Sequence, residues 1–205
     1  MGALIGGASL SSCSLMGNKK PVVGLVLGAG AARGFAHVGV IKALEAQGIR
    51  PDIVVGSSAG SVIATLLASG ATGNDLNRLA LNLDEATIAD WGLPFAGRFG
   101  GLIKGDALQN MVNREVQNKS IEQMRIPLGI VATELQSGKG TLFRTGNTGL
   151  AVRASCSVPG VFQPAVISGK EYVDGGLVAP VPVSYARQMG ATLVIAVNIS
   201  SEPVH

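Results

Sequence analysis

The segment that most constrains the fold is Val54–Val62, where an apolar run leads into Gly56-Ser57-Ser58-Ala59-Gly60 and a second apolar run follows at once. The first run has the character of a buried strand and the second that of a helix. The pattern therefore predicts a sharp strand-to-helix turn with Ser58 at its apex. Glycines at positions 56 and 60 remove the Cβ atoms that would obstruct so tight a bend. A serine presented in this way is typical of a nucleophile for acyl transfer. The backbone N–H of the next residue, Ala59, is expected to face the same pocket as the serine hydroxyl.

The length and composition favour one α/β domain. The chain has 205 residues and 47% of them are hydrophobic, mostly small aliphatic side chains in short runs, which is typical of a buried parallel sheet covered by helices. Apolar runs alternate with helical segments, and two pairs of runs have hairpin spacing. We therefore predict a three-layer α/β/α fold around a mostly parallel, mixed sheet. The expected strands are 22–27, 53–55, 127–133, 141–144, 166–167, 171–173 and a buried 192–198, and the expected helices end near 47, 69, 82, 116, 155 and 189. Asp106 is expected to cap the helix that ends near 116.

The basic balance of the chain does not indicate a nucleic-acid partner. The net charge is +3, but the basic residues are scattered and Lys19-Lys20 is the only adjacent pair. Mild attraction to an anionic lipid surface stays open. Cys13 and Cys156 give neither zinc-ligand spacing nor a disulfide framework.

Residues 1–20 differ from the rest, so we expect a flexible leader before a domain over residues 21–205. Leu10-Ser11-Ser12-Cys13 resembles the lipobox of bacterial lipoproteins, in which the cysteine becomes lipidated, but the positive n-region is lacking. Two interpretations stay open: a lipoprotein anchored at Cys13, or a cytoplasmic protein that binds membranes peripherally. No stretch approaches the roughly 18 apolar residues of a membrane span.

A glycine-rich loop, Gly28–Gly34, follows the first expected strand and begins a helix. One interpretation is a dinucleotide fingerprint, but the third glycine falls one place late, and Ser57-Ser58 stands where an acidic residue is required. The alternative is that N–H groups at this helix start stabilise the oxyanion formed when Ser58 attacks a carbonyl. Arg33 either holds the turn, contacts an anionic head group, or is an ordinary surface arginine.

The base that would activate Ser58 is not an obvious histidine. The chain has only His37 and His205, and His37 lies among apolar positions, which favours a packed side chain over a general base. Asp174 ends an apolar strand and precedes Gly175-Gly176, so its carboxylate has room to approach another segment. Asp-Gly is also a turn signal in its own right. In a chain with so few histidines, we prefer Asp174 as the base.

Together these segments resemble the patatin-like phospholipases, especially the bacterial members. The resemblance covers residues 21–199 and is carried by 28–40, 56–60 and 174–176, with further similarity at 101–105, 153–162 and 180–182. It implies a Ser58–Asp174 dyad without a catalytic histidine, and lipid ester hydrolysis without a metal or other cofactor. It also implies an oxyanion hole, which we assign to Gly30, Ala31, Ala32, Arg33, Gly34 and Ala59. Two positions depart from the usual pattern: Ala29 replaces a frequent glycine and Cys156 a frequent serine.

From the resemblance we expect a serine lipid acyl hydrolase of the phospholipase A, lysophospholipase or esterase type. Its expected partner is a lipid or phospholipid at a membrane surface. The apolar residues of the long segment 84–105 are expected to supply either the mouth for the acyl chain or ordinary cap packing: Trp91, Leu93, Phe95 and Phe99. Two rival functions remain, a catalytically weak lipid-binding or regulatory protein and a nucleotide-binding module.

Overall fold

The computed structural model describes residues 20–82 and 103–200. Cys13 and the aromatic residues expected at the acyl-chain mouth therefore lie outside the described residues. The strands are β1 (Val23–Leu27), β2 (Ile53–Ser57), β3 (Leu128–Glu134), β4 (Gly140–Phe143), β5 (Ala165–Ile167), β6 (Lys170–Val173) and β7 (Leu193–Val197). The α-helices are α1 (Ala36–Ala46), α2 (Ala59–Ser69), α3 (Gly73–Asn82), α5 (Asp106–Glu115), α6 (Thr148–Cys156) and α7 (Val183–Gln188). Short 3₁₀ helices span Ala31–Phe35, Ile121–Gln123 and Gly175–Leu177.

The strands form one mixed sheet. Hydrogen-bonded neighbours follow the order β5, β6, β3, β2, β1 and β7, and β4 also pairs with β3. The pairs among β3, β2, β1 and β7 are parallel, whereas β4 and β6 run antiparallel to β3. The prediction of a mostly parallel, mixed sheet is confirmed.

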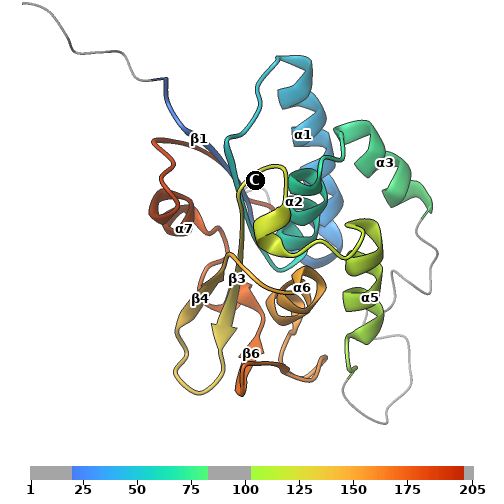
Figure 1. Ribbon diagram of the computed structural model, residues 1–205, viewed down its shortest axis with the longest axis vertical. Coiled ribbons are helices and arrows are strands. Elements are labelled where there is room, and N and C mark those ends of the chain that lie inside the picture. Colours follow the sequence, from blue (N-terminus) through green and yellow to red (C-terminus); the bar gives the residue numbers. More distant parts are fainter. Residues whose placement is uncertain (1–19, 83–102, 201–205) are drawn as a thin grey trace, which may run out of the picture.

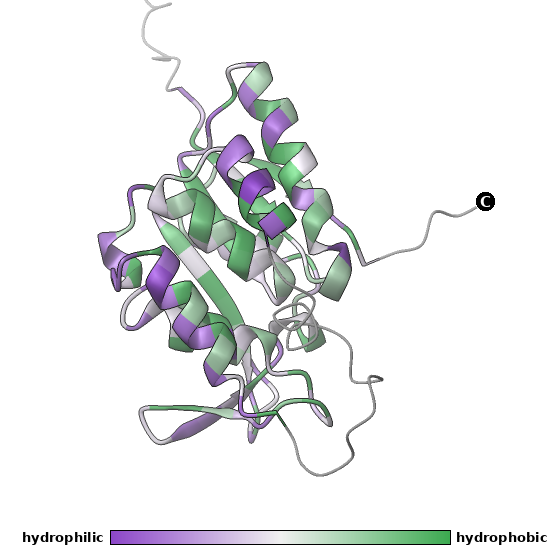
Figure 2. Cartoon of the chain, turned by 90° about the vertical axis from the view of Figure 1, so that its right-hand side faces the viewer, coloured by the Kyte–Doolittle hydropathy of each residue, from purple (hydrophilic) through white to green (hydrophobic). Residues whose placement is uncertain are grey.

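Helices cover both faces of the sheet, because successive strand residues point to opposite sides. Leu25 and Leu27 pack with buried residues of α1, α2, α3, α5 and α6, whereas Val26 between them packs with α7. Figure 1 shows α7 alone on one side of the sheet and the other five labelled helices on the opposite side. Figure 2 looks onto the five-helix face, where hydrophobic strand segments lie behind helices whose outer surfaces carry the hydrophilic residues. The expected three-layer α/β/α architecture is confirmed.

The last strand departs from expectation, since the apolar run 192–198 predicts a buried strand. Among residues 20–82 and 103–200, β7 is the terminal strand of the hydrogen-bonded order and pairs with β1 alone. Each of its residues is either exposed or half-buried, and Leu193 is 48% exposed. An apolar run thus identifies a strand but does not give its position in the sheet. Within the described residues, no helix is long and apolar enough to span a bilayer.

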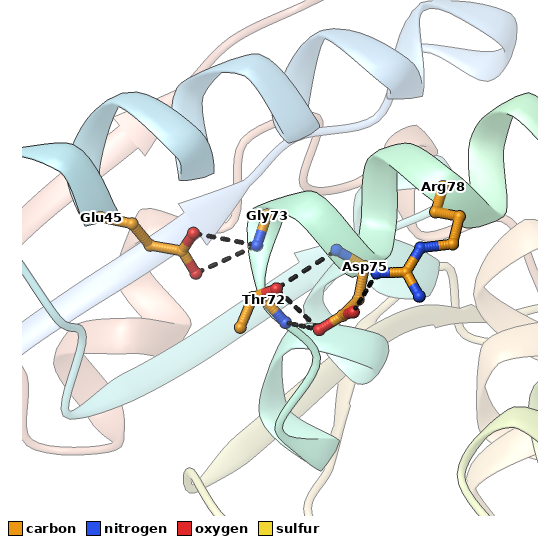
Figure 3. Close-up of polar contacts among 5 residues, drawn as sticks. All are labelled: Glu45, Thr72, Gly73, Asp75 and Arg78. Carbon is orange, nitrogen blue, oxygen red and sulfur yellow. Dashed lines mark hydrogen bonds and ion pairs between the residues drawn. The ribbon is translucent and has the colours of Figure 1, made fainter.

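The start of α3 shows how the helical layer is held together (Figure 3). The Thr72 hydroxyl accepts the N–H of Asp75, and the Asp75 carboxylate accepts the N–H of Thr72, which is the reciprocal arrangement of a capping box. Glu45 of α1 accepts the next free N–H, that of Gly73. The helix expected to start at Asp106 is capped differently, because Gly105 is its N-cap and Asp106 instead forms an ion pair with Arg153.

Candidate active site

Ser58 and Asp174 meet because β2 and β6 lie on the same edge of β3. Val131 pairs with Ser57 of β2 and also with β4, so those two strands flank opposite edges of β3. Thr133 pairs with Val173 of β6 and also with β4, so β6 must share the edge of β2. The two strands run in opposite directions and end two positions apart along β3. Ser58 and Asp174, each the first residue after its strand, therefore face each other across this gap.

Ser58 occupies a strained turn that only its glycine neighbours permit. Its backbone has φ 51° and ψ −128°, and it is the N-cap of α2. A Cβ on Gly56 would lie 2.4 Å from the Cα of Ser61, and a Cβ on Gly60 would lie 2.1 Å from the carbonyl oxygen of Leu27. Both glycines are thus required by close backbone approach, as the sequence pattern predicts.

The two side chains form a direct hydrogen bond. Ser58 Oγ donates to Asp174 Oδ2 at 2.5 Å. The other carboxylate oxygen accepts the N–H of Gly176 at 2.6 Å, and Thr133 Oγ1 donates to the backbone carbonyl of Asp174 at 2.8 Å. Gly175 fits only without a side chain, because a Cβ there would lie 2.1 Å from the Val131 carbonyl oxygen. The carboxylate is therefore fixed in position and aimed at the serine.

Burial alters the acidity of this carboxylate. Asp174 is only 6% exposed. Desolvation raises its pKa above the ordinary value for aspartate, and the hydrogen bonds from Ser58 and Gly176 oppose this rise without cancelling it. A carboxylate with a raised pKa takes up a proton more readily, which suits a general base.

The glycine-rich loop lies beside the serine because β1 pairs with β2, with Leu27 opposite Gly56. Gly30 is the N-cap of the 3₁₀ helix 31–35, and a Cβ on Gly34 would lie 3.0 Å from the Cβ of Ala59. The first N–H groups of a helix, here those of Ala31 and Ala32, have no acceptor within it. The same holds for Ala59 at the start of α2.

Arg33 differs from its neighbours in this loop. Its N–H donates to the carbonyl of Gly30, so this amide is already paired. Its guanidinium Nη1 donates to the carbonyl oxygens of Ser200, at 3.3 Å, and Ile199, at 3.5 Å. Of the three roles open to Arg33, these contacts favour holding the turn.

His37 is buried beneath the loop. It is 0% exposed, and its Nε2 lies 2.9 Å from the carbonyl oxygen of Gly28, to which it donates. Burial lowers the pKa of this imidazole. Within the described part of the chain, its Nδ1 has no hydrogen-bond partner. The expectation of a packed, hydrogen-bonded histidine is confirmed.

Cys156 is a further titratable side chain close to Asp174. Burial raises the pKa of the Cys156 thiol strongly, and its Sγ lies 3.9 Å from Ser61 Oγ. A partly buried cysteine in this environment is expected to be unreactive. Across residues 20–82 and 103–200, no group of three or more His, Cys, Asp or Glu side chains is arranged to hold a metal ion.

Comparison with known proteins identifies the family. The model of the family described as patatin-like phospholipase matches residues 25–187. The chain belongs to the patatin-like phospholipase family. It is 35% identical over 184 residues to an uncharacterized NTE family protein of Mycobacterium tuberculosis, a match that covers 90% of this chain and 51% of the relative. It is 32% identical to human patatin-like phospholipase domain-containing protein 6, covering 88% of this chain and 13% of that protein. Lysophospholipase NTE1 of Mycosarcoma maydis is 33% identical, with 87% of this chain and 10% of the relative covered.

Solved structures show the same fold. VipD from Legionella pneumophila matches with a TM-score of 0.57 and 16% identity, covering 75% of this chain and 45% of that chain. The ExoU–SpcU complex of Pseudomonas aeruginosa matches with a TM-score of 0.56 and 23% identity, covering 90% and 42%. The chain thus spans about half the length of the mycobacterial relative, and less of the others.

Some polar groups around the pair have no signal in the sequence. Thr133 lies inside a buried strand, and Ser61 is one of several small residues in α2, where its hydroxyl donates to the Ser58 carbonyl at 2.6 Å. Neither can be singled out locally, because its role depends on which segments the sheet brings together.

Proposed function

We propose that this chain hydrolyses carboxylic esters of lipids, with Ser58 as the nucleophile and Asp174 as its base. The observation that carries the proposal is the 2.5 Å hydrogen bond between a serine on a strained strand-to-helix turn and a buried, oriented carboxylate. Family membership supports the same chemistry. The nucleotide-binding alternative is disfavoured because the N–H groups of Gly28 and Ala29 already donate to the carbonyls of Val197 and Pro180.

The proposed reaction has two steps. Asp174 removes the Ser58 proton as Oγ forms a bond to the ester carbonyl carbon, and the N–H groups of Ala31, Ala32 and Ala59 are the proposed donors to the oxyanion. The intermediate collapses when the bond to the alcohol breaks and Asp174 passes its proton to that oxygen. Water then attacks the acyl-enzyme, losing its proton to Asp174, and the carboxylate returns the proton to Ser58 as the acyl product leaves.

The surroundings of the pair favour an apolar substrate. Leu177, three residues after Asp174, is 59% exposed, and Val178 beside it is 39% exposed. Val158, which follows the residue whose carbonyl accepts the Asp174 N–H, is 41% exposed. Large apolar side chains left open beside polar reacting groups match a long acyl chain joined to an ester. Because one relative is named a lysophospholipase, we propose a lysophospholipid or related phospholipid at a membrane surface as the substrate class.

Covalent labelling tests the nucleophile. A fluorophosphonate probe is expected to label the protein, and peptide mass spectrometry should locate the adduct on Ser58. Ser57→Ala is the matched control, because Ser57 is buried next to the nucleophile and its hydroxyl has no partner within the described residues. Absence of labelling together with retained lipid binding would instead support the non-catalytic, regulatory alternative.

The pH dependence tests the base. Asp174 must be ionised to accept the serine proton, so kcat/KM should fall as pH decreases through its pKa. Because burial raises that pKa, the acid limb should lie above the range of an ordinary aspartate. His37→Gln retains an N–H donor for the Gly28 carbonyl and should leave the limb in place. A limb that disappears in this variant, measured as kcat/KM between pH 4 and 9, would assign the titration to the histidine.

A further inference from the structure

The last turn of α6 touches both members of the catalytic pair. Ser155 Oγ accepts the backbone N–H of Ser58 at 2.8 Å and donates its own proton to the carbonyl of Val131 at 2.5 Å. Two residues later, the carbonyl of Ser157 accepts the backbone N–H of Asp174 at 2.9 Å. One helical turn is therefore hydrogen-bonded to the nucleophile on one side and to the base on the other.

The Ser155 contact falls on the part of the turn that needs support. Ser58 has φ 51° and ψ −128°, a conformation that non-glycine residues adopt only when their surroundings enforce it. Its N–H precedes the first turn of α2 and so has no acceptor inside that helix. Ser155 is 0% exposed and Ser58 is 8% exposed, so water does not readily replace this hydrogen bond.

The other hydrogen-bond partner of Ser155 is the carbonyl of Val131, against which two segments of the site are packed. Val131 lies opposite Ser57 in the β2–β3 pairing, and its carbonyl oxygen is the atom that Gly175 approaches closely. The Ser155 hydroxyl thus connects the nucleophile's own backbone to the β3 position against which both β2 and the segment after β6 are packed. A shift of Ser58 relative to β3 must break at least one of the two hydrogen bonds that the Ser155 hydroxyl makes.

We propose that Ser155 is a positioning residue, which holds the Ser58 backbone so that Oγ stays within hydrogen-bond reach of Asp174. The inference rests on the Ser58–Asp174 dyad of the proposed function. Ser155 contacts Ser58 only through the backbone and takes no part in proton transfer. Its effect is therefore on the rate of the chemical step and not on substrate binding.

The chain offers a matched control for this proposal. Thr148, in the first turn of α6, is also 0% exposed, and its hydroxyl donates to the carbonyl of Lys119 at 2.7 Å. Thr148→Val removes a buried hydroxyl from the same helix, at the end opposite to the one that is hydrogen-bonded to Ser58 and Asp174. A general loss of stability in α6 would affect both variants alike, whereas a positioning role is specific to Ser155.

The experiment measures kcat, KM and the rate of fluorophosphonate labelling for Ser155→Ala, Thr148→Val and the unaltered protein, with melting curves for each. We expect Ser155→Ala to lower kcat and the labelling rate by about 10²-fold, because displacements near 1 Å at a reacting group have effects of this size. KM should stay within about 3-fold, and Thr148→Val should keep kcat within about 3-fold. Equal kcat values for the two variants, or a loss confined to KM, would overturn the proposal.

Two further variants cover the case in which Ser155→Ala does not fold. Ser155→Thr keeps the hydroxyl, whereas Ser155→Cys keeps the size of the side chain but forms weaker hydrogen bonds. The threonine variant should therefore be the more active of the two. Equal activities would overturn the proposal. Ser58→Ala in parallel separates this inference from the dyad. If Ser58→Ala retains activity, the dyad itself fails. If Ser58→Ala is inactive while Ser155→Ala resembles Thr148→Val, only the positioning role fails.

Discussion

Ser58→Ala and Asp174→Asn are each expected to lower kcat for ester hydrolysis by roughly 10⁴-fold or more. The first removes the oxygen that is proposed to form the acyl-enzyme. The second keeps the shape of the side chain but replaces the proton acceptor by an amide, which cannot take the Ser58 proton from 2.5 Å away. Hydrolysis of a short-chain p-nitrophenyl ester and of a lysophospholipid measures both losses.

The two substitutions should not be additive. Because each residue acts only through the other, the double variant is expected to be no less active than either single variant. Ser57→Ala serves again as the neighbouring control and should retain activity. Substantial turnover by a folded Asp174→Asn protein would contradict the dyad and require a different base.

The same asparagine variant should be more stable than the unaltered protein at neutral pH. Burial raises the pKa of folded Asp174 above its value in the unfolded chain, so the folded state binds this proton more tightly. As pH rises from the unfolded pKa to the folded pKa, the free energy of unfolding falls, and above the folded pKa the full cost of the buried charge is present. Asparagine is neutral at every pH and avoids this cost. Melting temperatures of the two proteins should therefore differ at pH 7 and converge in acid.

Much of the fold follows from local pattern. The first two strands, the serine turn and the first helices can be located because continuous apolar runs are bounded by glycine. The exposure of β7 cannot be predicted, because it depends on the strand's place at the end of the sheet. The prediction that Asp106 caps α5 is wrong, since Asp106 finds an ion-pair partner, Arg153, 47 positions away.

The candidate site, like the fold, has features that the sequence predicts and features that only the tertiary structure shows. Ser58 and Asp174 can be proposed from the sequence because each has a local signature of glycines beside a strand end. Their approach along β3 depends on a strand register that no local pattern specifies. Asp174 is oriented by the hydroxyl of Thr133 and the carbonyl of Ser157. These roles cannot be predicted from the sequence either, because a polar atom in a buried segment gives no indication of its distant partner. Sequence thus identifies the candidate reacting groups, and tertiary structure determines their geometry.

Gly60→Ala should destabilise the fold severely, lowering the free energy of unfolding by more than about 3 kcal/mol. Gly60 lies in the first turn of α2, and a Cβ there would lie 2.1 Å from the carbonyl oxygen of Leu27 and 2.6 Å from that of Gly28. These are backbone atoms of β1 and of the loop after it, so no side-chain rotation relieves the overlap. The helix would have to move away from β1, and the serine turn would move with it.

Gly39→Ala provides the opposite result from the same chemical change. Gly39 also lies in a helix, α1, but a Cβ there meets no atom within 4 Å. Alanine is preferred over glycine inside helices, so this variant should gain about 0.5–1 kcal/mol in the free energy of unfolding. Urea unfolding, monitored by circular dichroism, measures the free energy of unfolding of both glycine variants. If Gly60→Ala were as well tolerated as Gly39→Ala, the close packing of α2 on β1 would be refuted, and with it the geometry that presents Ser58 to Asp174.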